Sequence, residues 1–127
     1  MTDTSESTQT EDVTAVVDTY FAAWNEPDPS ARAELIEQAW APAGRYVDPL
    51  QESDGHEGFS ELAANVHAAY PGQRFRRLTQ VDVHHDQARF GWELSGDAGV
   101  TVAGVDVARI DPDGKLAAVT GFFGDLT

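Results

Sequence analysis

Cysteine and long apolar runs are both absent from this sequence of 127 residues. The lack of cysteine excludes disulfide bonds, thiol catalysis and thiolate metal sites. The lack of a long apolar run excludes a transmembrane helix. No signal peptide is recognisable before the first polar stretch. We therefore expect a cytoplasmic protein.

Basic residues are also scarce. The chain has 8 lysines and arginines against 22 acidic residues, which gives a formal net charge of -14, and Lys115 is the only lysine. Such a surface repels nucleic acids and anionic membranes, so we expect neither as a partner. The one dense basic group is Arg74, Arg76 and Arg77. Strand alternation would point Arg76 away from the other two, which favours positions on the surface.

The composition is nevertheless that of a folded protein. Hydrophobic residues make up 41% of the chain, and its length suits one domain with its own core. Residues 1–10 are small, polar and acidic, so we expect a disordered N-terminal tail. Residues 11–127 contain no repeat or linker and are predicted to form a single domain.

Helical periodicity marks the first part of the chain. Apolar residues spaced by three and four predict a helix over residues 11–25. Its apolar face consists of Val13, Val16, Val17, Tyr20 and Trp24. Asp28 and Pro29 are typical of the N-cap and first position of a second helix. The apolar stripe of that helix is Ala31, Leu35, Ala39 and Trp40, and the sequence APAG ends it.

A short strand, RYVDP, is predicted next, and it stops at Pro49 because proline cannot continue a central strand. A loop, LQESDGHEG, follows. A third helix is predicted from about Phe59 to Tyr70, with Phe59, Leu62, Ala63 and Val66 facing inward.

After the sequence PG the apolar period changes to two, which indicates β-strands. One predicted face carries Phe75, Arg77, Thr79, Val81 and Val83, and after the turn HHDQ another carries Ala88, Phe90, Trp92 and Leu94. A third strand spans residues 100–110 and the last spans residues 116–123. The sequence DPDGK between them predicts a tight turn, because proline presets one backbone dihedral angle and glycine adopts the left-handed conformation.

This order predicts an α+β fold in which three N-terminal helices pack on one face of a strongly curved, mainly antiparallel sheet. A curved sheet covered by helices encloses a conical pocket, which is a natural site for a small ligand.

Asp106 is unusual because it lies in the middle of the apolar strand TVAGVDVARI. A buried carboxylate must find a partner, take up a proton or reach water. Asp106 shares its strand face with aliphatic residues and with Gly104, which leaves room beside it. We expect this face to meet the helices, so that burial raises the pKa of Asp106 and keeps it protonated. The alternatives are that the face is the outer one, or that Asp106 bonds to nearby backbone.

Asp48 and Tyr20 are the other candidate site residues. Asp48 ends a strand before a proline, a position that suits either a functional carboxylate or a simple turn opener. Tyr20 lies on the inner face of the first helix, where its hydroxyl needs a partner, and a bond to backbone would satisfy it.

Three blocks containing these residues resemble the steroid delta-isomerases (ketosteroid isomerases), within the superfamily of nuclear transport factor 2 and the SnoaL-like polyketide cyclases. The blocks are TAVVDTYFAAWNEPD, GRYVDPL and GVDVARIDPDGKLAAVTGFFGD. The resemblance implies a cone-shaped barrel and a homodimer formed through the sheet. It places Tyr20 at the catalytic tyrosine, Asp48 at the general base and Asp106 at the protonated aspartate.

The resemblance also implies a reaction. In that family a carboxylate removes a proton next to a ketone and returns it further along, while two donors stabilise the enolate oxygen. Here Asp48 would be the base, and Tyr20 and Asp106 the donors, with no metal and no organic cofactor. The substrate would be an apolar cyclic ketone. The alternatives are a non-catalytic ligand-binding or accessory domain, and a SnoaL-like cyclase or dehydratase that uses the same carboxylates.

Apolar side chains on the predicted inner faces would line the ligand pocket: Trp24, Trp40, Phe59, Val66, Phe90, Trp92, Val102 and Ala108. The three tryptophans would narrow a pocket of steroid size. The chain also departs from the family after Asp106, where a large or polar residue is frequent and this sequence has Val107.

The histidines carry weaker signals. His84 and His85 are adjacent on a strand and should face opposite ways, so a turn is favoured over a metal site. His67 is either an auxiliary acid or base at the pocket edge or a partly exposed structural residue. His56 is assigned to the loop. Phe122 and Phe123 should face opposite sides of the last strand, one toward the core and one toward a partner subunit.

Overall fold

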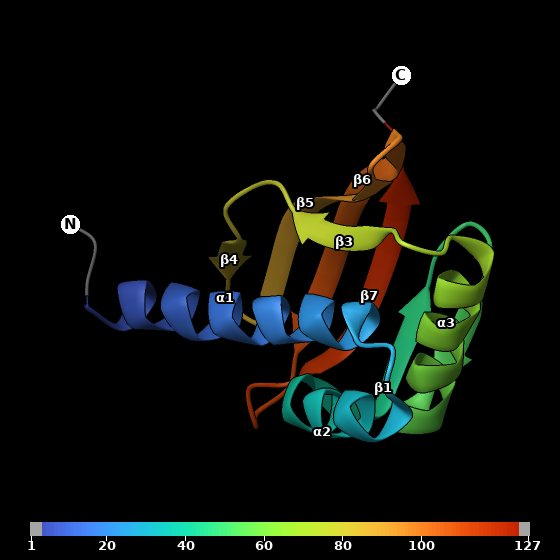
Figure 1. Cartoon of the computed structure of the whole chain (residues 1–127). Helices are drawn as coiled ribbons and strands as arrows, with labels where there is room; N and C mark the ends of the chain where they lie inside the picture. The colour runs from blue at the N-terminus through green and yellow to red at the C-terminus, as the bar shows by residue number, and fades with distance from the viewer. Residues whose placement is uncertain (1–3, 125–127) are drawn as a thin grey trace.

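The structure is a computed structural model that describes residues 4–124, and within them it contains three helices and seven strands (Figure 1). The helices are α1 (Thr4–Asn25), α2 (Pro29–Ala39) and α3 (Gly55–Ala69). The strands are β1 (Trp40–Val47), β2 (Glu52–Asp54), β3 (Arg74–Arg77), β4 (Asp82–His84), β5 (Gln87–Gly96), β6 (Gly99–Ile110) and β7 (Leu116–Phe123).

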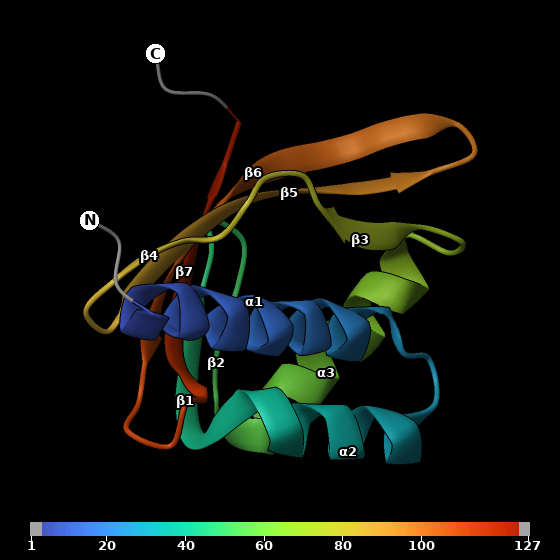
Figure 2. The ribbon, with the colours of Figure 1, turned by 90° about the vertical axis from the view of Figure 1, so that its left-hand side faces the viewer.

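The strands form one sheet in the order β2-β1-β7-β6-β5-β3, with β4 also paired to β5. The β1–β7 pair is parallel and the other pairs are antiparallel. Figure 2 shows β5 and β6 bending away from the direction of β1 and β7, with the helices on the concave side. The predicted α+β architecture, with three helices on one face of a curved and mainly antiparallel sheet, is therefore confirmed.

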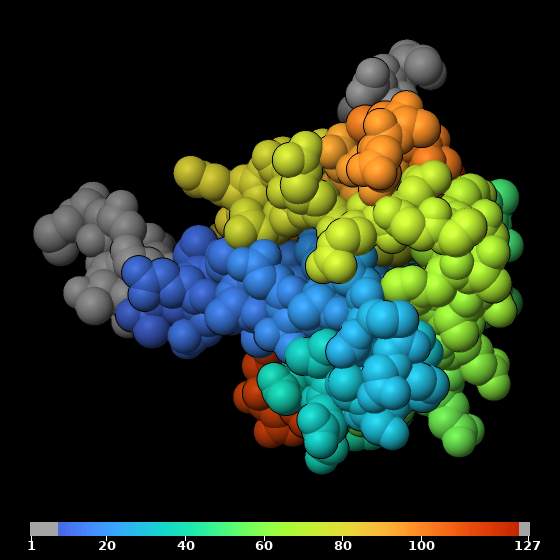
Figure 3. Space-filling model, viewed as in Figure 1, coloured from blue at the N-terminus to red at the C-terminus, as the bar shows by residue number. Residues whose placement is uncertain are grey.

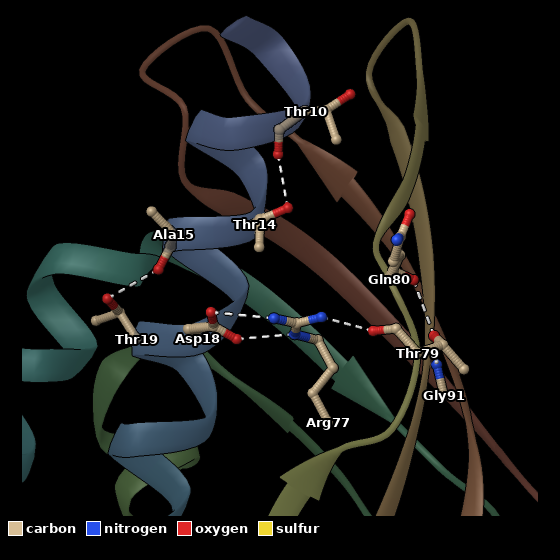
Figure 4. Close-up of polar contacts among 9 residues, drawn as sticks. All are labelled: Thr10, Thr14, Ala15, Asp18, Thr19, Arg77, Thr79, Gln80 and Gly91. Atoms are coloured by element: carbon tan, nitrogen blue, oxygen red, sulfur yellow. Dashed lines mark hydrogen bonds and ion pairs between the residues drawn. The ribbon is translucent and has the colours of Figure 1, made fainter. Parts of the chain in front are cut away.

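Helix α1 is longer than the sequence predicted. It begins at Thr4, so residues 4–10 belong to the helix and not to a disordered tail. Residues 1–3 of the predicted tail lie outside the described residues. Further along the helix, the Thr14 and Thr19 hydroxyls donate to the backbone carbonyls of Thr10 and Ala15 at 2.7 and 3.1 Å (Figure 4).

Helix α2 begins as predicted, with the Asp28 side chain accepting a hydrogen bond from the Ala31 amide at 2.9 Å. Its buried face differs from the predicted stripe, since Ala31 and Leu35 are only partly buried. The buried residues are Arg32, Ile36 and Ala39. The Arg32 guanidinium donates to the carbonyls of Glu26, Pro27 and Ser60 and to the Ser60 hydroxyl.

Strand β1 and helix α3 both start earlier than predicted. Trp40 was predicted to lie on the stripe of the second helix, and APAG was predicted to end that helix, but both belong to β1, because α2 already ends at Ala39. The pairing of β1 with β7 shifts register between Trp40 and Arg45. Gly44 permits this, because a side chain there would collide with the Trp40 indole. The predicted loop over residues 50–58 contains β2 and the first turn of α3, which starts at Gly55 with a positive φ.

The predicted long strand over residues 75–83 is divided into β3 and β4. The segment between them stays attached to β5, since the Leu78 amide donates to the Gly91 carbonyl and the Gly91 amide donates to the Thr79 hydroxyl. Arg77 joins this edge to α1 through Asp18, at 2.8 and 3.3 Å, and also donates to the Thr79 carbonyl (Figure 4). Arg76 pairs with Glu93. Residues two apart on a strand share a face, so Arg76 lies on the side of Arg74 and Arg77 is the one that turns the other way. The prediction that Arg76 points away from the other two was therefore wrong.

The core lies between the helices and the concave side of the sheet. Figure 3 shows α1, α2 and α3 closing over this side of the molecule. Strand β6 separates its faces clearly, because Asp106 is 3% exposed whereas Val105 and Val107 are 39% and 40% exposed. Phe122 is exposed and pairs with Val105. The expected homodimer through this outer face stays a prediction.

Within residues 4–124, none of the helices is both long enough and apolar enough to cross a membrane.

Candidate active site

Asp106 points into the core, as the strand alternation predicted. Its Oδ2 accepts a hydrogen bond from the Tyr20 hydroxyl at 3.0 Å, and its Oδ1 accepts one from the Trp92 indole Nε1 at 2.9 Å. Tyr20 therefore meets Asp106 across 86 residues of sequence, and both side chains are buried.

Burial raises the pKa of Asp106 to about 7, against the opposing effect of the hydrogen bonds from Tyr20 and Trp92. The negative charge of Asp48 adds to the increase. A carboxyl in this condition is substantially protonated at neutral pH, which is the state that the sequence predicted for Asp106.

Asp48 follows β1 in a tight turn. Its Oδ1 accepts hydrogen bonds from the backbone amides of Leu50 at 2.8 Å and Gln51 at 3.0 Å. Its Oδ2 accepts one from the Tyr46 hydroxyl at 2.7 Å. Pro49 ends the strand and lets the chain turn back over the carboxylate. Asp48 is thus held by three donors while remaining partly accessible.

Tyr46 is the residue that the sequence analysis missed. Its side chain is buried, and burial raises its pKa well above the ordinary value, helped by the negative charge of Asp106 and by the hydrogen bond to Asp48. A signal was available, because residues two apart on a strand share one face. Tyr46 and Asp48 have this spacing, so alternation alone would place the two side chains on one face.

Gly121 lies between the two carboxyl groups. It is the direct partner of Asp106 on β6, while Tyr46 and Val47 on the other side pair with Val119 and Thr120 of β7. A Cβ at position 121 would lie 3.0 Å from Asp106 Oδ1, 3.4 Å from Asp48 Cβ and 3.5 Å from the Tyr46 hydroxyl. Because glycine has no side chain, Asp106, Asp48 and Tyr46 can all pack closely around position 121.

A cavity of about 220 Å³ adjoins this cluster. Tyr46, Asp48 and Gln51 supply polar groups on its wall, and Leu50 and Tyr70 are exposed lining residues. The remaining lining residues are Trp24, Val66, Phe75, Trp92, Leu94, Thr101, Val102 and Phe123.

The structure divides the predicted pocket residues into two groups. Trp24, Val66, Trp92 and Val102 line the cavity, as expected. The other four are packed in the core and are absent from the cavity wall: Trp40, Phe59, Phe90 and Ala108. These four residues belong to the hydrophobic core, so fewer of the predicted residues line the cavity than the sequence suggested.

Tyr20 and Asp106 are also absent from the cavity wall. The Tyr20 hydroxyl is occupied by Asp106, and the two lie behind the wall formed by Tyr46 and Trp92. The structure therefore brings Tyr20, Asp48 and Asp106 into one region, with only Asp48 on the wall.

A larger groove of about 810 Å³ runs between α1 and the turn before β7, and it includes Asp12, Asp111 and Asp113. None of the paired tyrosines and aspartates lines it, so the smaller cavity is the candidate site.

The histidines make structural contacts. His67 Nε2 donates to the Trp24 carbonyl at 2.9 Å, and His56 Nε2 donates to the Trp40 carbonyl at 2.7 Å. His56 belongs to the first turn of α3 and not to a loop. His84 and His85 do not point apart, because His85 has a φ of 53°, and their Nδ1 atoms lie 3.1 Å from each other.

Residues 17–119 match the family model described as the SnoaL-like domain. The chain belongs to the SnoaL-like family. A similar solved structure, from Agrobacterium tumefaciens, is named a candidate isomerase of the SnoaL-like family. It is 34% identical, with a TM-score of 0.84, and the match covers 91% of this chain and 99% of that one.

More distant structures share the fold of this SnoaL-like protein. A candidate polyketide cyclase from Sinorhizobium meliloti is 21% identical, with a TM-score of 0.68 and coverage of 88% and 97% of the two chains. A protein of cystatin-like fold from Methylobium petroleophilum is 13% identical, with a TM-score of 0.74 and coverage of 92% and 78%. No curated protein matches the chain.

Proposed function

We propose that this protein is an enzyme that transfers a proton within a small, apolar cyclic ketone, with Asp48 as the general base. The observation that carries the proposal is the Asp48 carboxylate on the wall of a largely apolar cavity, held in place by Tyr46 and two backbone amides. A fixed carboxylate in a site with little water is suited to removing a proton from carbon.

The hydrogen bonds of Asp48 indicate which oxygen acts. Among the residues that the structure describes, Oδ1 accepts hydrogen bonds from two N–H groups, whereas Oδ2 accepts one only from the Tyr46 hydroxyl and keeps a lone pair. We therefore assign proton abstraction to Oδ2. The substrate C–H bond breaks, its electron pair forms a C=C bond, and the carbonyl π electrons move to oxygen. Asp48 then returns the proton to the far carbon of the dienolate, so no co-reactant is needed.

The size of the cavity favours a substrate smaller than a steroid. Pockets for drug-sized ligands enclose roughly 300–1,000 Å³, and this one encloses about 220 Å³. A single six-membered ring fits this space. The isomerisation of cyclohex-3-enone to cyclohex-2-enone is a suitable test, since conjugation of the product gives a strong ultraviolet signal.

The test is this isomerisation, followed by absorbance, for the wild type, Asp48→Asn and Asp113→Asn. Asp113 is an exposed aspartate in the turn between β6 and β7, outside the cavity, and it serves as the matched control. We expect turnover to fall by about 10²–10⁴-fold in Asp48→Asn and to stay unchanged in Asp113→Asn. Saturable binding of the ketone with no turnover by the wild type would contradict the proposal and indicate a ligand-binding domain.

A further inference from the structure

We propose that Tyr46, and not Tyr20, donates the hydrogen bond that stabilises the enolate oxygen of the substrate. This inference rests on the proposed proton transfer at Asp48 and adds a second catalytic residue to it. The two tyrosines are the phenols closest to the two carboxyl groups, and the structure gives them different access to the cavity.

Tyr20 is poorly placed to touch a substrate. Its hydroxyl donates to Asp106, its side chain is 1% exposed, and it does not line the cavity. Its ring is enclosed by five other aromatic rings, those of Phe21, Trp24, Trp40, Phe59 and Phe90. Contact with a ligand would require Tyr20 to leave a buried acceptor without its partner, which is costly.

Tyr46, unlike Tyr20, has access to the cavity and lies beside the base. It lines the cavity, and its hydroxyl lies 2.7 Å from Asp48 Oδ2, the oxygen assigned to take the proton. In a ketone the carbon that loses the proton and the carbonyl oxygen are only two bonds apart. A substrate whose C–H bond faces Oδ2 therefore brings its oxygen close to the Tyr46 hydroxyl.

The transfer of charge during the reaction explains how Tyr46 changes partner. Before the reaction the negative charge is on Asp48, and the Tyr46 hydroxyl donates to it in a charge-assisted hydrogen bond. When Asp48 takes up the proton, the negative charge moves to the enolate oxygen. The hydroxyl then turns about its C–O bond and donates to the enolate.

Tyr46 keeps its own proton throughout this exchange. Burial, the negative charge of Asp106 and the bond to Asp48 all raise its pKa above the ordinary value. The phenol therefore acts as a hydrogen-bond donor and does not compete with Asp48 for protons. The donor is already oriented before the reaction, which is the property that makes such groups effective.

Binding of 4-nitrophenolate tests this inference without turnover, because it presents a negative oxygen on an apolar ring, as the enolate does. The measurement uses Asp48→Asn, whose neutral amide replaces the protonated carboxyl of the intermediate. Adding Tyr46→Phe should weaken binding at least about tenfold, whereas adding Tyr20→Phe should change it less than about threefold. Absorbance of the bound phenolate gives the affinity.

The same substitutions in the wild-type background give the kinetic arm. Tyr46→Phe should lower kcat by about 10²–10³-fold with little change in KM, and Tyr20→Phe should lower it less than about threefold. The opposite ranking of the two variants, or no phenolate binding to Asp48→Asn, would overturn the inference. Failure of the proposed function is separate, because it appears as full turnover in Asp48→Asn or none in the wild type.

Discussion

The site contains two tyrosine–aspartate pairs that differ in environment. Tyr46 and Asp48 form the wall pair, which faces the cavity, and Tyr20 and Asp106 form the buried pair, which lies behind it. Asp48 is partly accessible and is held by two backbone amides in addition to its tyrosine. Asp106 is buried and is held by two side chains.

The comparison shows that residue type alone does not assign a role. In both pairs a phenol donates to a carboxyl group, but only the wall pair can touch a ligand. Burial raises the pKa of Asp106 to about 7 and favours its neutral form. Two carboxyl groups in different environments can therefore serve different purposes in one site.

Gly121→Ala tests the spacing between the two pairs and should have a large effect. The added methyl group would lie 3.0 Å from Asp106 Oδ1 and close to Asp48 Cβ and the Tyr46 hydroxyl. Because a displacement of about 1 Å can reduce activity by about 10²-fold, we expect a loss of roughly that size in kcat for cyclohexenone isomerisation.

Thr120→Ala is the control for this change, since Thr120 is the exposed neighbour on the same strand. It should keep wild-type activity. Equal losses in the two variants would mean that β7 is simply sensitive to substitution and that the spacing at Gly121 has no special role.

Tyr20→Phe tests the structural role of the buried pair. The substitution leaves Asp106 Oδ2 without its donor in the core, so we expect a loss of about 1–3 kcal/mol in the free energy of unfolding. Tyr46→Phe should cost less than about 1 kcal/mol, because its partner Asp48 keeps two backbone donors and partial access to water. Urea denaturation measures both, and a larger loss in Tyr46→Phe would reverse the assignment.

The pH dependence of stability sharpens the contrast between the two aspartates. The pKa of Asp106 is about 7 in the folded protein and about 3.9 in an unfolded chain. The folded state therefore holds the proton of Asp106 more tightly than the unfolded state does. The contribution of Asp106 to the free energy of unfolding is full below about pH 4, and it is lost as the pH rises through about 7. The expected slope in that range is at most about -1.4 kcal/mol per pH unit.

Asp106→Asn should remove this slope, because the amide does not titrate. The measurement is urea denaturation of the wild type and Asp106→Asn between about pH 5.5 and 8. Subtracting the two free energies of unfolding at each pH cancels the contributions of the other titrating groups. A difference that is constant across this range would show that Asp106 has an ordinary pKa in the folded protein.

Much of this arrangement could be predicted from the sequence, because it follows from periodicity. The alternation along residues 100–110 placed Asp106 on the inner face, and the turn chemistry of Asp28 located the start of α2. The register of the hairpin before β7 follows from the turn DPDGK. The same alternation could have assigned Tyr46 to the face of Asp48.

Other features depend on contacts that local sequence does not encode. The three residues of β2 form a strand because they pair with β1, and the register shift in β1 depends on how Trp40 packs over Gly44. The partner of the Tyr20 hydroxyl was equally unpredictable. A helix periodicity shows that Tyr20 faces inward, but the distance to a strand 86 residues away decides that its hydroxyl meets Asp106 rather than the cavity.

The central claim is that the wall pair performs the chemistry while the buried pair supports it. The most direct test is the rate at which the protein exchanges the α-protons of cyclohexanone with deuterium oxide, measured by proton NMR for the wild type, Asp48→Asn and Asp106→Asn. We predict that Asp48→Asn loses about 10²–10⁴-fold of the exchange rate, whereas Asp106→Asn stays within about tenfold of the wild type. Exchange that survives in Asp48→Asn and disappears in Asp106→Asn would contradict the account.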